Sequence, residues 1–324
     1  DYDWIQLTSG EWLKGEFIAM YQETLEFDSD KLDLLKLDWE DVREVRSAGT
    51  MQVGFGRHLT AVGQIFIDQD TLRVLGDKEL QFPRSQIVTI TAGEPKEINF
   101  WSFKASLGAN VRQGNTEQIE TTGQLNIIRR TPLNRINLEY LATYNETDAL
   151  TAADNQRATA SWSRYRSTRF FWIPIYGEWF RDPIQNIASR WSVGGGAGYE
   201  IIDTSKVEWA VQGGPAYQGT RFQDVAEGDS TDAETPALVI STTYEHELKS
   251  WLDFLFDYRF FLVDEDSGTY THHMVSGIEL DLTSLIDLDI KAIWDRTQNP
   301  QPDSEGNIPE QDDLRLVVAL GLDF

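Results

Sequence analysis

The chain has 324 residues and no cysteine, and its 53 acidic residues outnumber 28 lysines and arginines, for a formal net charge of −25. This acidity argues against nucleic acid as a partner, because binding it requires basic side chains that neutralise phosphates. Without cysteine, disulfide scaffolds, thiolate zinc sites and cysteine nucleophiles are excluded. The 11 Trp, 11 Tyr and 16 Phe in a chain of mean hydropathy −0.40 indicate apolar residues sorted onto one face of strands.

Residues 1–95 contain an internal repeat, with copies at about 3–47 and 49–93. Ile5–Gly10 opens the first copy and Met51–Gly56 opens the second. Each copy reads as short strands joined by polar turns, which predicts a duplicated small β-barrel module of SH3-like or Sm-like type. Two interpretations are open. In the first, the two copies serve only to pack against each other. In the second, the module is an adaptor that binds peptidoglycan, a periplasmic protein or the mouth of the following domain. Residues 93–97 are the predicted linker.

Residues 97–324 alternate apolar and polar side chains over segments of about ten residues. Trp101 and Phe103 face one way, for example, while Ser102 and Lys104 face the other. The polar face carries too many charges to be a core, so the pattern predicts an all-β, up-and-down antiparallel transmembrane barrel of about twelve strands. The expected strands are 100–112, 117–129, 134–146, 155–166, 168–181, 188–201, 205–219, 235–248, 250–263, 268–282, 285–297 and 311–324.

The connections between these strands alternate between short turns and long polar loops. The expected long loops are 147–154, 182–187, 220–234, 264–267 and 298–310. Short turns are typical of the periplasmic end of an outer-membrane barrel and long loops of the extracellular end. An even number of strands places both ends of the barrel segment on the side of the short turns. The module at 1–95 is therefore predicted to lie in the periplasm. The last strand ends on Phe324 with apolar residues at alternate positions before it, which matches the assembly signal of bacterial outer-membrane proteins.

Aromatic side chains are expected to form two girdles at headgroup depth, where they anchor a barrel. Outer-membrane lipid and lipopolysaccharide are therefore predicted partners. Phe171 is also expected on the lipid face. The predicted girdle comprises Trp101, Trp179, Trp191, Trp209, Tyr217, Tyr244, Tyr258, Trp294 and Phe324.

Three glycine-containing segments resemble a known family. They are 107–117, with a hairpin at 114–117, then 194–199 and 213–217. These segments look like the salt-induced outer membrane protein family, a domain of unknown function, over about 97–324. The resemblance implies a Gram-negative outer-membrane location and no established activity.

Alternation assigns many charged side chains to the lumen. These are the acids Glu120, Glu139, Glu178, Glu200, Glu208, Glu245, Asp253, Asp257, Glu279, Asp281, Asp287, Asp289 and Asp295 and the bases Lys104, Arg112, Arg157, Arg259, Lys291 and Arg315. One interpretation is a mouth that favours cations. The other is a hydrated wall whose charges pair across strands, since about twelve strands leave little free interior.

Four glycines, Gly194, Gly196, Gly198 and Gly214, are also expected to line the lumen. They would let a loop, a ligand or the side chains of Trp172 and Tyr176 lie close against the wall, or they permit strong curvature.

Candidates for chemistry are few. His272 and Ser276 share a predicted lipid-facing strand, but four strand positions separate them by roughly 13 Å, too far for a nucleophile and its base. Acids of the long loop, Asp224, Glu227, Asp229 and Asp232, are a candidate for binding a divalent cation. No cofactor is predicted.

The leading functional hypothesis is a non-enzymatic outer-membrane barrel with a role in envelope structure or interaction. The alternative is a narrow, cation-leaning channel or small-solute transporter, and a third is a lipid hydrolase. The sequence leaves the oligomeric state open.

Overall fold

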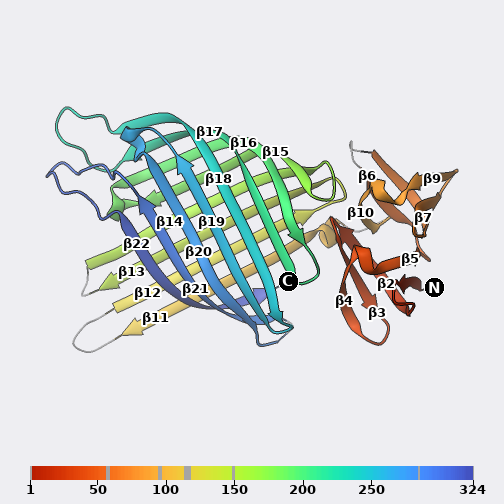
Figure 1. Cartoon of the computed structure of the whole chain (residues 1–324). Coiled ribbons are helices and arrows are strands. Elements are labelled where there is room, and N and C mark those ends of the chain that lie inside the picture. The colour runs from red at the N-terminus through yellow and green to blue at the C-terminus, as the bar shows by residue number, and fades with distance from the viewer. Residues whose placement is uncertain are drawn as a thin grey trace.

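A computed structural model describes residues 2–55, 59–93, 97–112, 118–147, 150–283 and 285–323. Two β structures follow each other along the chain, a small N-terminal unit and a large barrel (Figure 1). Short 3-10 helices lie at Trp39–Asp41 (η1), Arg84–Gln86 (η2), Glu97–Phe100 (η3), Pro183–Gln185 (η4) and Glu265–Ser267 (η5). Within the described residues, no helix has the length and apolarity to cross a membrane.

The N-terminal module consists of ten strands around one apolar core. Pairing closes β1, β5, β7, β6, β10 and β2 into a six-stranded ring, from which β3–β4 and β8–β9 extend. Phe17, Leu25 and Ile90 are fully or almost fully buried inside it. The strands are β1 (Asp3–Leu7), β2 (Trp12–Tyr21), β3 (Thr24–Ser29), β4 (Asp33–Asp38), β5 (Val42–Arg46), β6 (Met51–Phe55), β7 (Leu59–Ile67), β8 (Thr71–Leu75), β9 (Glu79–Pro83) and β10 (Ile87–Ala92).

The two halves of this module use the same pattern of pairing. In the first half β1 pairs with β2 and β5, and β3 joins β2 to β4. In the second half β6 pairs with β7 and β10, and β8 joins β7 to β9. The halves then exchange partners, because β5 pairs with β7 and β10 with β2. One small barrel is therefore built jointly by both predicted repeats.

The rest of the chain forms a closed antiparallel barrel of twelve strands, as predicted. Each strand pairs with its neighbour in sequence, and β11 pairs with β22 to close the barrel. Phe324, residues 94–96 of the predicted linker 93–97 and the predicted hairpin at 114–117 lie outside the described residues. The strands are β11 (Trp101–Arg112), β12 (Gln118–Arg130), β13 (Asn134–Thr147), β14 (Leu150–Tyr165), β15 (Phe170–Asp182), β16 (Ile187–Asp203), β17 (Val207–Phe222), β18 (Asp232–Lys249), β19 (Leu252–Leu262), β20 (Tyr270–Asp281), β21 (Ile286–Thr297) and β22 (Asp312–Asp323).

The N-terminal module sits at one end of this barrel, here called the near end, and the opposite end is the far end (Figure 1). Short turns at 131–133 and 204–206 lie at the near end, whereas the connections 223–231 and 298–311 lie at the far end. Two far-end strands extend beyond the predicted boundaries: β14 begins at Leu150 and β18 at Asp232. Polar residues at these strand ends still form ladder hydrogen bonds, although they break the alternation on which the prediction relied.

The outer surface of the barrel is apolar. Leu107, Leu314 and Leu316 are 75%, 72% and 68% exposed, and Leu125, Leu138, Ile175, Val193, Leu238, Ile240, Val318 and Leu320 are exposed as well. Interior positions of the same strands are polar and buried, for example Ser106, Thr122 and Ser241. An apolar exterior around a polar interior is the arrangement of a membrane-spanning barrel.

A bulge in β15 reverses the predicted orientation of one segment. The pairing between β15 and β16 shifts between Ile173 and Tyr176, around Pro174, which has no N–H to donate to the ladder. The extra residue exchanges the two faces beyond it. Phe171 is consequently 1% exposed and interior, and Trp172 is 51% exposed. The prediction of Phe171 on the lipid face and Trp172 in the lumen was therefore wrong, whereas Tyr176 packs against interior residues.

The module docks on the near end through the turn between β2 and β3. Gln22 has a left-handed backbone (φ 57°) and is 2% exposed. Its amide donates to Glu200 Oε1 at 2.7 Å and accepts from Arg130 Nη2 at 2.6 Å. The Glu23 N–H donates to Asp203 Oδ2 at 2.6 Å, and the Glu23 carboxylate pairs with Arg169 at 2.7 Å. These contacts hold the module against the barrel rim.

Candidate functional site

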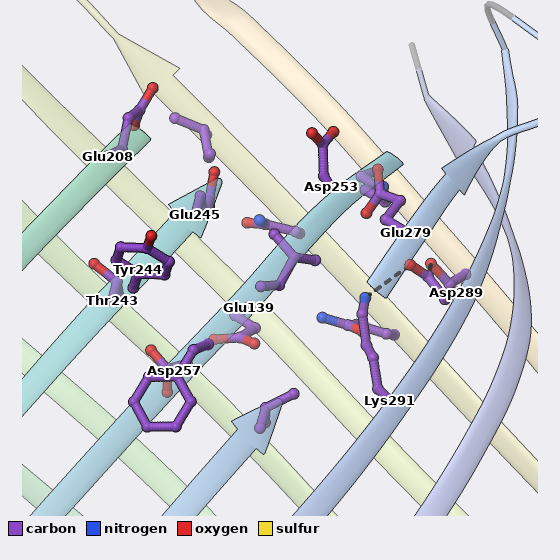
Figure 2. Close-up of a pocket in the computed structure, with 18 of the residues that line it drawn as sticks. Glu139, Glu208, Thr243, Tyr244, Glu245, Asp253, Asp257, Glu279, Asp289 and Lys291 are labelled. Atoms are coloured by element: carbon purple, nitrogen blue, oxygen red, sulfur yellow. Dashed lines mark hydrogen bonds and ion pairs between the residues drawn. The ribbon is translucent and has the colours of Figure 1, made fainter. Parts of the chain in front are cut away.

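A cavity of about 860 Å³ occupies the near half of the lumen (Figure 2). Eight carboxylate side chains and four lysines line it. The lysines are Lys36, contributed by β4 of the module, and Lys104, Lys206 and Lys291. The cavity therefore carries an excess of negative charge, to which the predicted acids Glu139 and Asp257 contribute at mid-height.

Six of these carboxylates lie opposite one another across neighbouring strands. Glu208 on β17 pairs in register with Glu245 on β18. Glu247 on β18 faces Asp253 on β19, which faces Glu279 on β20, which in turn faces Asp289 on β21. Figure 2 shows Glu208 beside Glu245 and Asp253 close to Glu279. We call these six residues the carboxylate row. Like charges directly opposite each other destabilise a sheet unless a cation lies between them.

Lysines neutralise only one part of this row. Lys104 contacts Glu279 and lies 2.7 Å from Asp287, and Lys291 lies 3.0 Å from Asp289. The other four members are Glu208, Glu245, Glu247 and Asp253. Within the described residues, none of their carboxylates has a hydrogen-bond or ion-pair partner at the distances that define one. Glu208 and Glu245 are solvent-exposed at the mouth. These four carboxylates are therefore the members of the row that no lysine or arginine neutralises within the described residues.

An apolar layer lines the cavity toward the far end. Leu141, Val275, Ile293, Val317 and Ala319 point inward from β13, β20, β21 and β22, and all five line the cavity. Ile293 is 2% exposed. These residues occupy interior positions that strict alternation would make polar, so the layer is a local departure from the barrel pattern.

A second layer, of buried ion pairs, lies directly beyond the apolar one. Glu178 accepts from Arg157 at 2.9 Å and from Arg259 at 2.8 Å. Asp295 accepts from Arg157 at 2.8 Å, lies 2.8 Å from His273 Nδ1 and contacts Arg315. Every one of these side chains is at most 12% exposed. We call these six residues the ion-pair layer, and Arg259 and Arg315 also pair with Asp257 and Asp313 at 3.7 and 3.3 Å.

The far half of the lumen contains further packed side chains. Ala237, Val239, Phe261 and Val263 form a buried cluster with Tyr176. The large cavity therefore opens toward the near end and stops at mid-height.

The remaining predicted lumen charges lie apart from the cavity. Glu200 contacts the module through Gln22, Asp281 is exposed at the near rim opposite Asp287, and Glu120 is half-buried in the far part of β12. The Arg112 side chain is outside the described residues.

The interior glycines allow neighbouring side chains and strands to lie close against the barrel wall. The predicted contact of Trp172 with these glycines was wrong. Phe171, rather than Trp172, lies over Gly198, where an added Cβ would be 2.2 Å from its ring. At Gly196 and Gly214 an added Cβ would be 2.1 Å from a backbone oxygen of the neighbouring strand. These two glycines therefore serve the close approach of β16 and β17.

Most of the predicted girdle aromatics pack against each other on the outer surface. Ring centroids are 6.1 Å apart for Trp191 and Tyr217 and 6.4 Å apart for Trp209 and Tyr244. Trp101 stacks on Phe103, and Trp179 pairs in register with Trp191.

His272 belongs to a similar outer aromatic group. Its Nδ1 lies 2.7 Å from the Tyr258 hydroxyl, and its ring stacks on Trp294 at 5.4 Å. Ser276 faces Phe256 and Ala292 on the neighbouring strands. The two side chains are thus in separate surroundings.

Two of the four predicted loop acids are engaged in local contacts. Asp224 accepts from Ser304, and Asp232 lies 3.2 Å from Arg221. Among the described residues, the group with carboxylates close enough to share a metal ion is Glu279, Asp287 and Asp289. Lys104 and Lys291 already contact this group.

Sequence reasoning missed the module's contribution to the near end. Lys36 lines the cavity, and Tyr21 donates to the Arg130 carbonyl oxygen at 3.0 Å. Neither residue belongs to a motif. The polar turn Gln22–Glu23 between two apolar strands was the available signal, but it does not identify a docking partner.

Similar proteins were found among solved structures and protein families. The NanC porin matches at 8% identity and a TM-score of 0.41, covering 69% of this chain and 98% of that one. The translocator domain of the autotransporter NalP from Neisseria meningitidis matches at 10% identity and a TM-score of 0.37, covering 69% and 87%. The outer membrane channel DcaP of Acinetobacter baumannii matches at 10% identity and a TM-score of 0.31, covering 100% and 94%.

These values are too low to bear on the role of this chain. A comparison with curated protein sequences found no match. A family model described as "Protein of unknown function, DUF481" matches residues 105–324. Because this match covers more than half of the sequence, the chain belongs to the DUF481 family.

Proposed function

We propose that this chain is a non-enzymatic barrel of the bacterial outer membrane whose lumen is a blind cup, open to the periplasm, that binds a small cationic group. The apolar outer surface supports membrane insertion. Short turns at the near end and longer connections at the far end support a periplasmic near end and extracellular far loops. The N-terminal module would then lie in the periplasm.

The observation that carries the proposal is the carboxylate row. Four of its members have no cationic partner among the described residues, and they border a cavity of about 860 Å³. For charges about 5 Å apart, repulsion is about 1 kcal/mol in water and about 3 kcal/mol at an effective dielectric constant of ~20. A bound cation would remove this repulsion, so the folded barrel itself favours occupancy.

Binding fits the lumen better than free passage does. An ion that entered the cup would meet Leu141, Ile293 and Val317 and then the ion-pair layer. Apolar constrictions exclude water, and the paired charges beyond them present no vacant site. The structure therefore favours retention of a ligand at the near end.

Calorimetric titration of the purified full chain with spermidine, and separately with Mg²⁺, would test the proposal. We expect saturable binding that weakens by about tenfold when Glu208→Gln and Glu245→Gln are combined, a loss of about 1.4 kcal/mol. The control removes the same charge from the far loop, through Glu227→Gln and Asp229→Asn. Equal weakening by both double variants, or no binding to the wild type, would refute the proposed cup.

A gated, cation-leaning channel is the second candidate, because the same acids would select cations if the two layers moved apart. Planar-bilayer recordings separate the candidates. The blind cup predicts no unitary conductance from the wild type, whereas cation-selective steps would favour the channel.

A lipid hydrolase receives no support, since His272 is engaged by Tyr258 and Trp294 while Ser276 faces Phe256 and Ala292. We also propose that the module arose by duplication, as its matching strand pairings suggest. The Gln22 and Glu23 contacts favour the barrel mouth as its binding partner over peptidoglycan or a separate protein. The narrower assignment to the salt-induced outer membrane proteins stays a prediction, as does lipopolysaccharide as a partner.

A further inference from the structure

One buried arginine in the far half of the lumen has no carboxylate partner. Arg190 on β16 is 7% exposed, and its Nε donates to Thr220 Oγ1 at 3.3 Å. Within the described part of the chain, no carboxylate oxygen lies within the 4.0 Å that defines an ion pair with its guanidinium. Arg157, Arg259 and Arg315 each have such a partner. Burying an unpaired charge is costly, so Arg190 requires an explanation.

A second unsatisfied donor lies beside it. Gln218 on β17 is 1% exposed, and its Oε1 accepts from Ser192 Oγ at 3.2 Å, while its Nε2 has no hydrogen-bond partner. Arg190 is in register with Thr220, and Ser192 with Gln218, so Arg190 and Gln218 are diagonal neighbours on one interior face. Both line a cavity of about 20 Å³. A space of this size holds one water-sized particle.

Three buried carboxylates near Arg190 accept from other donors. Glu178 is shared by two guanidiniums, and Asp295 by two guanidiniums and His273. Asp182 is 3% exposed, and its Oδ1 accepts the N–H groups of Ile184 and Gln185 at 3.1 and 3.2 Å. None of these carboxylates therefore forms an ion pair with the Arg190 guanidinium, and Asp182, which accepts only uncharged N–H groups, has no ion pair of its own among the described residues.

We propose that this cavity is a binding site for a monatomic anion, chloride in practice, held by the Arg190 guanidinium and the Gln218 amide N–H. A water molecule would satisfy the hydrogen bonds but leave the buried charge uncompensated. Phosphate or a carboxylate metabolite is too large for about 20 Å³. The site borders the ion-pair layer, whose Glu178 and Asp295 line the same cavity, and the anion would contact the guanidinium that this layer leaves unpaired.

Two measurements on the full-length protein test the site. Crystals grown in bromide should give an anomalous peak within hydrogen-bond distance of Arg190 and Gln218. In solution, replacing gluconate by chloride at constant ionic strength should raise the midpoint of thermal unfolding in a saturable manner. The control Arg221→Gln, which alters an exposed arginine, should leave both results unchanged.

Gln218→Glu is the decisive variant, because it places a carboxylate of nearly identical shape beside Arg190. We expect it to fold, to lose the bromide peak and to unfold at the same temperature in chloride and gluconate. Arg190→Gln should lose the peak as well. An empty cavity in wild-type crystals with bromide, or a chloride effect that persists in Gln218→Glu, would overturn the proposal.

Discussion

Replacing Glu178 by glutamine tests whether the ion-pair layer is a rigid, mutually dependent structure. The Glu178 carboxylate is 4% exposed and accepts from Arg157, Arg259 and the Tyr176 hydroxyl at 2.9, 2.8 and 3.1 Å. Glu178→Gln preserves the shape but removes the charge that neutralises two buried guanidiniums. Breaking a buried pair in this way costs about 3–5 kcal/mol, since the partner charges stay buried.

The assay is urea unfolding of the purified full chain, with the midpoint and slope of the barrel transition measured for each variant. Glu23→Gln is the matched control, because Glu23 forms a partly exposed pair with Arg169 and should contribute about 0–1 kcal/mol. If Glu178→Gln destabilised the barrel no more than Glu23→Gln, the layer would be hydrated and mobile. The lumen would then be open to water at this height, contrary to the blind cup.

Three further predictions concern the apolar layer and the module. Ile293→Ala should lower the free energy of unfolding of the barrel by about 2–5 kcal/mol, measured in urea, because it leaves a cavity in a packed layer. Arg84→Ala should destabilise the module by on the order of 3 kcal/mol in the same assay, since the guanidinium donates to the Trp39, Val42 and Asp68 carbonyl oxygens; Arg73→Ala, at an exposed site, is the comparison. Hydrogen bonds from the Asp70 and Thr71 N–H groups hold the pKa of Asp68 below its ordinary value. The stability that this carboxylate provides is therefore present above about pH 4 and lost as the pH falls through the lowered pKa. Asp68→Asn should remove this decrease in stability at low pH, which is measured as the urea midpoint of the module against pH. A pH profile identical to that of the wild type would contradict this prediction.

The barrel itself was predictable because the alternation of side chains that defines it can be seen within each single strand. Ladder hydrogen bonding fixes a period of two, and the bilayer requires one face of every strand to be apolar, so Leu314 and Leu316 on β22 could be assigned outward from the sequence. The strand count followed from the same alternation. The assignment of faces from this alternation failed around Pro174, because a bulge there inserts one residue, reverses the two faces and turns Phe171 inward.

The carboxylate row was visible in the sequence only as a list of acids. Alternation assigns Glu208, Glu245, Asp253 and Glu279 to the lumen, but it carries no information on height or register. Pairing between strands decides that Glu208 meets Glu245 while Lys104 reaches Asp287. That pairing also decides which carboxylates of the row have a lysine partner and which have none among the described residues.

The sequence by itself determined a membrane-type barrel with a polar lumen and a separate β module before it, because both depend on side-chain period within single strands. Only the tertiary structure decided that an apolar cluster and buried ion pairs meet inside the lumen and that Gln22 docks the module on the rim. It also decided that Arg190 has no carboxylate partner among the described residues. These features depend on which side chains from distant strands meet inside one closed wall, and closure of that wall is a property of all twelve strands together.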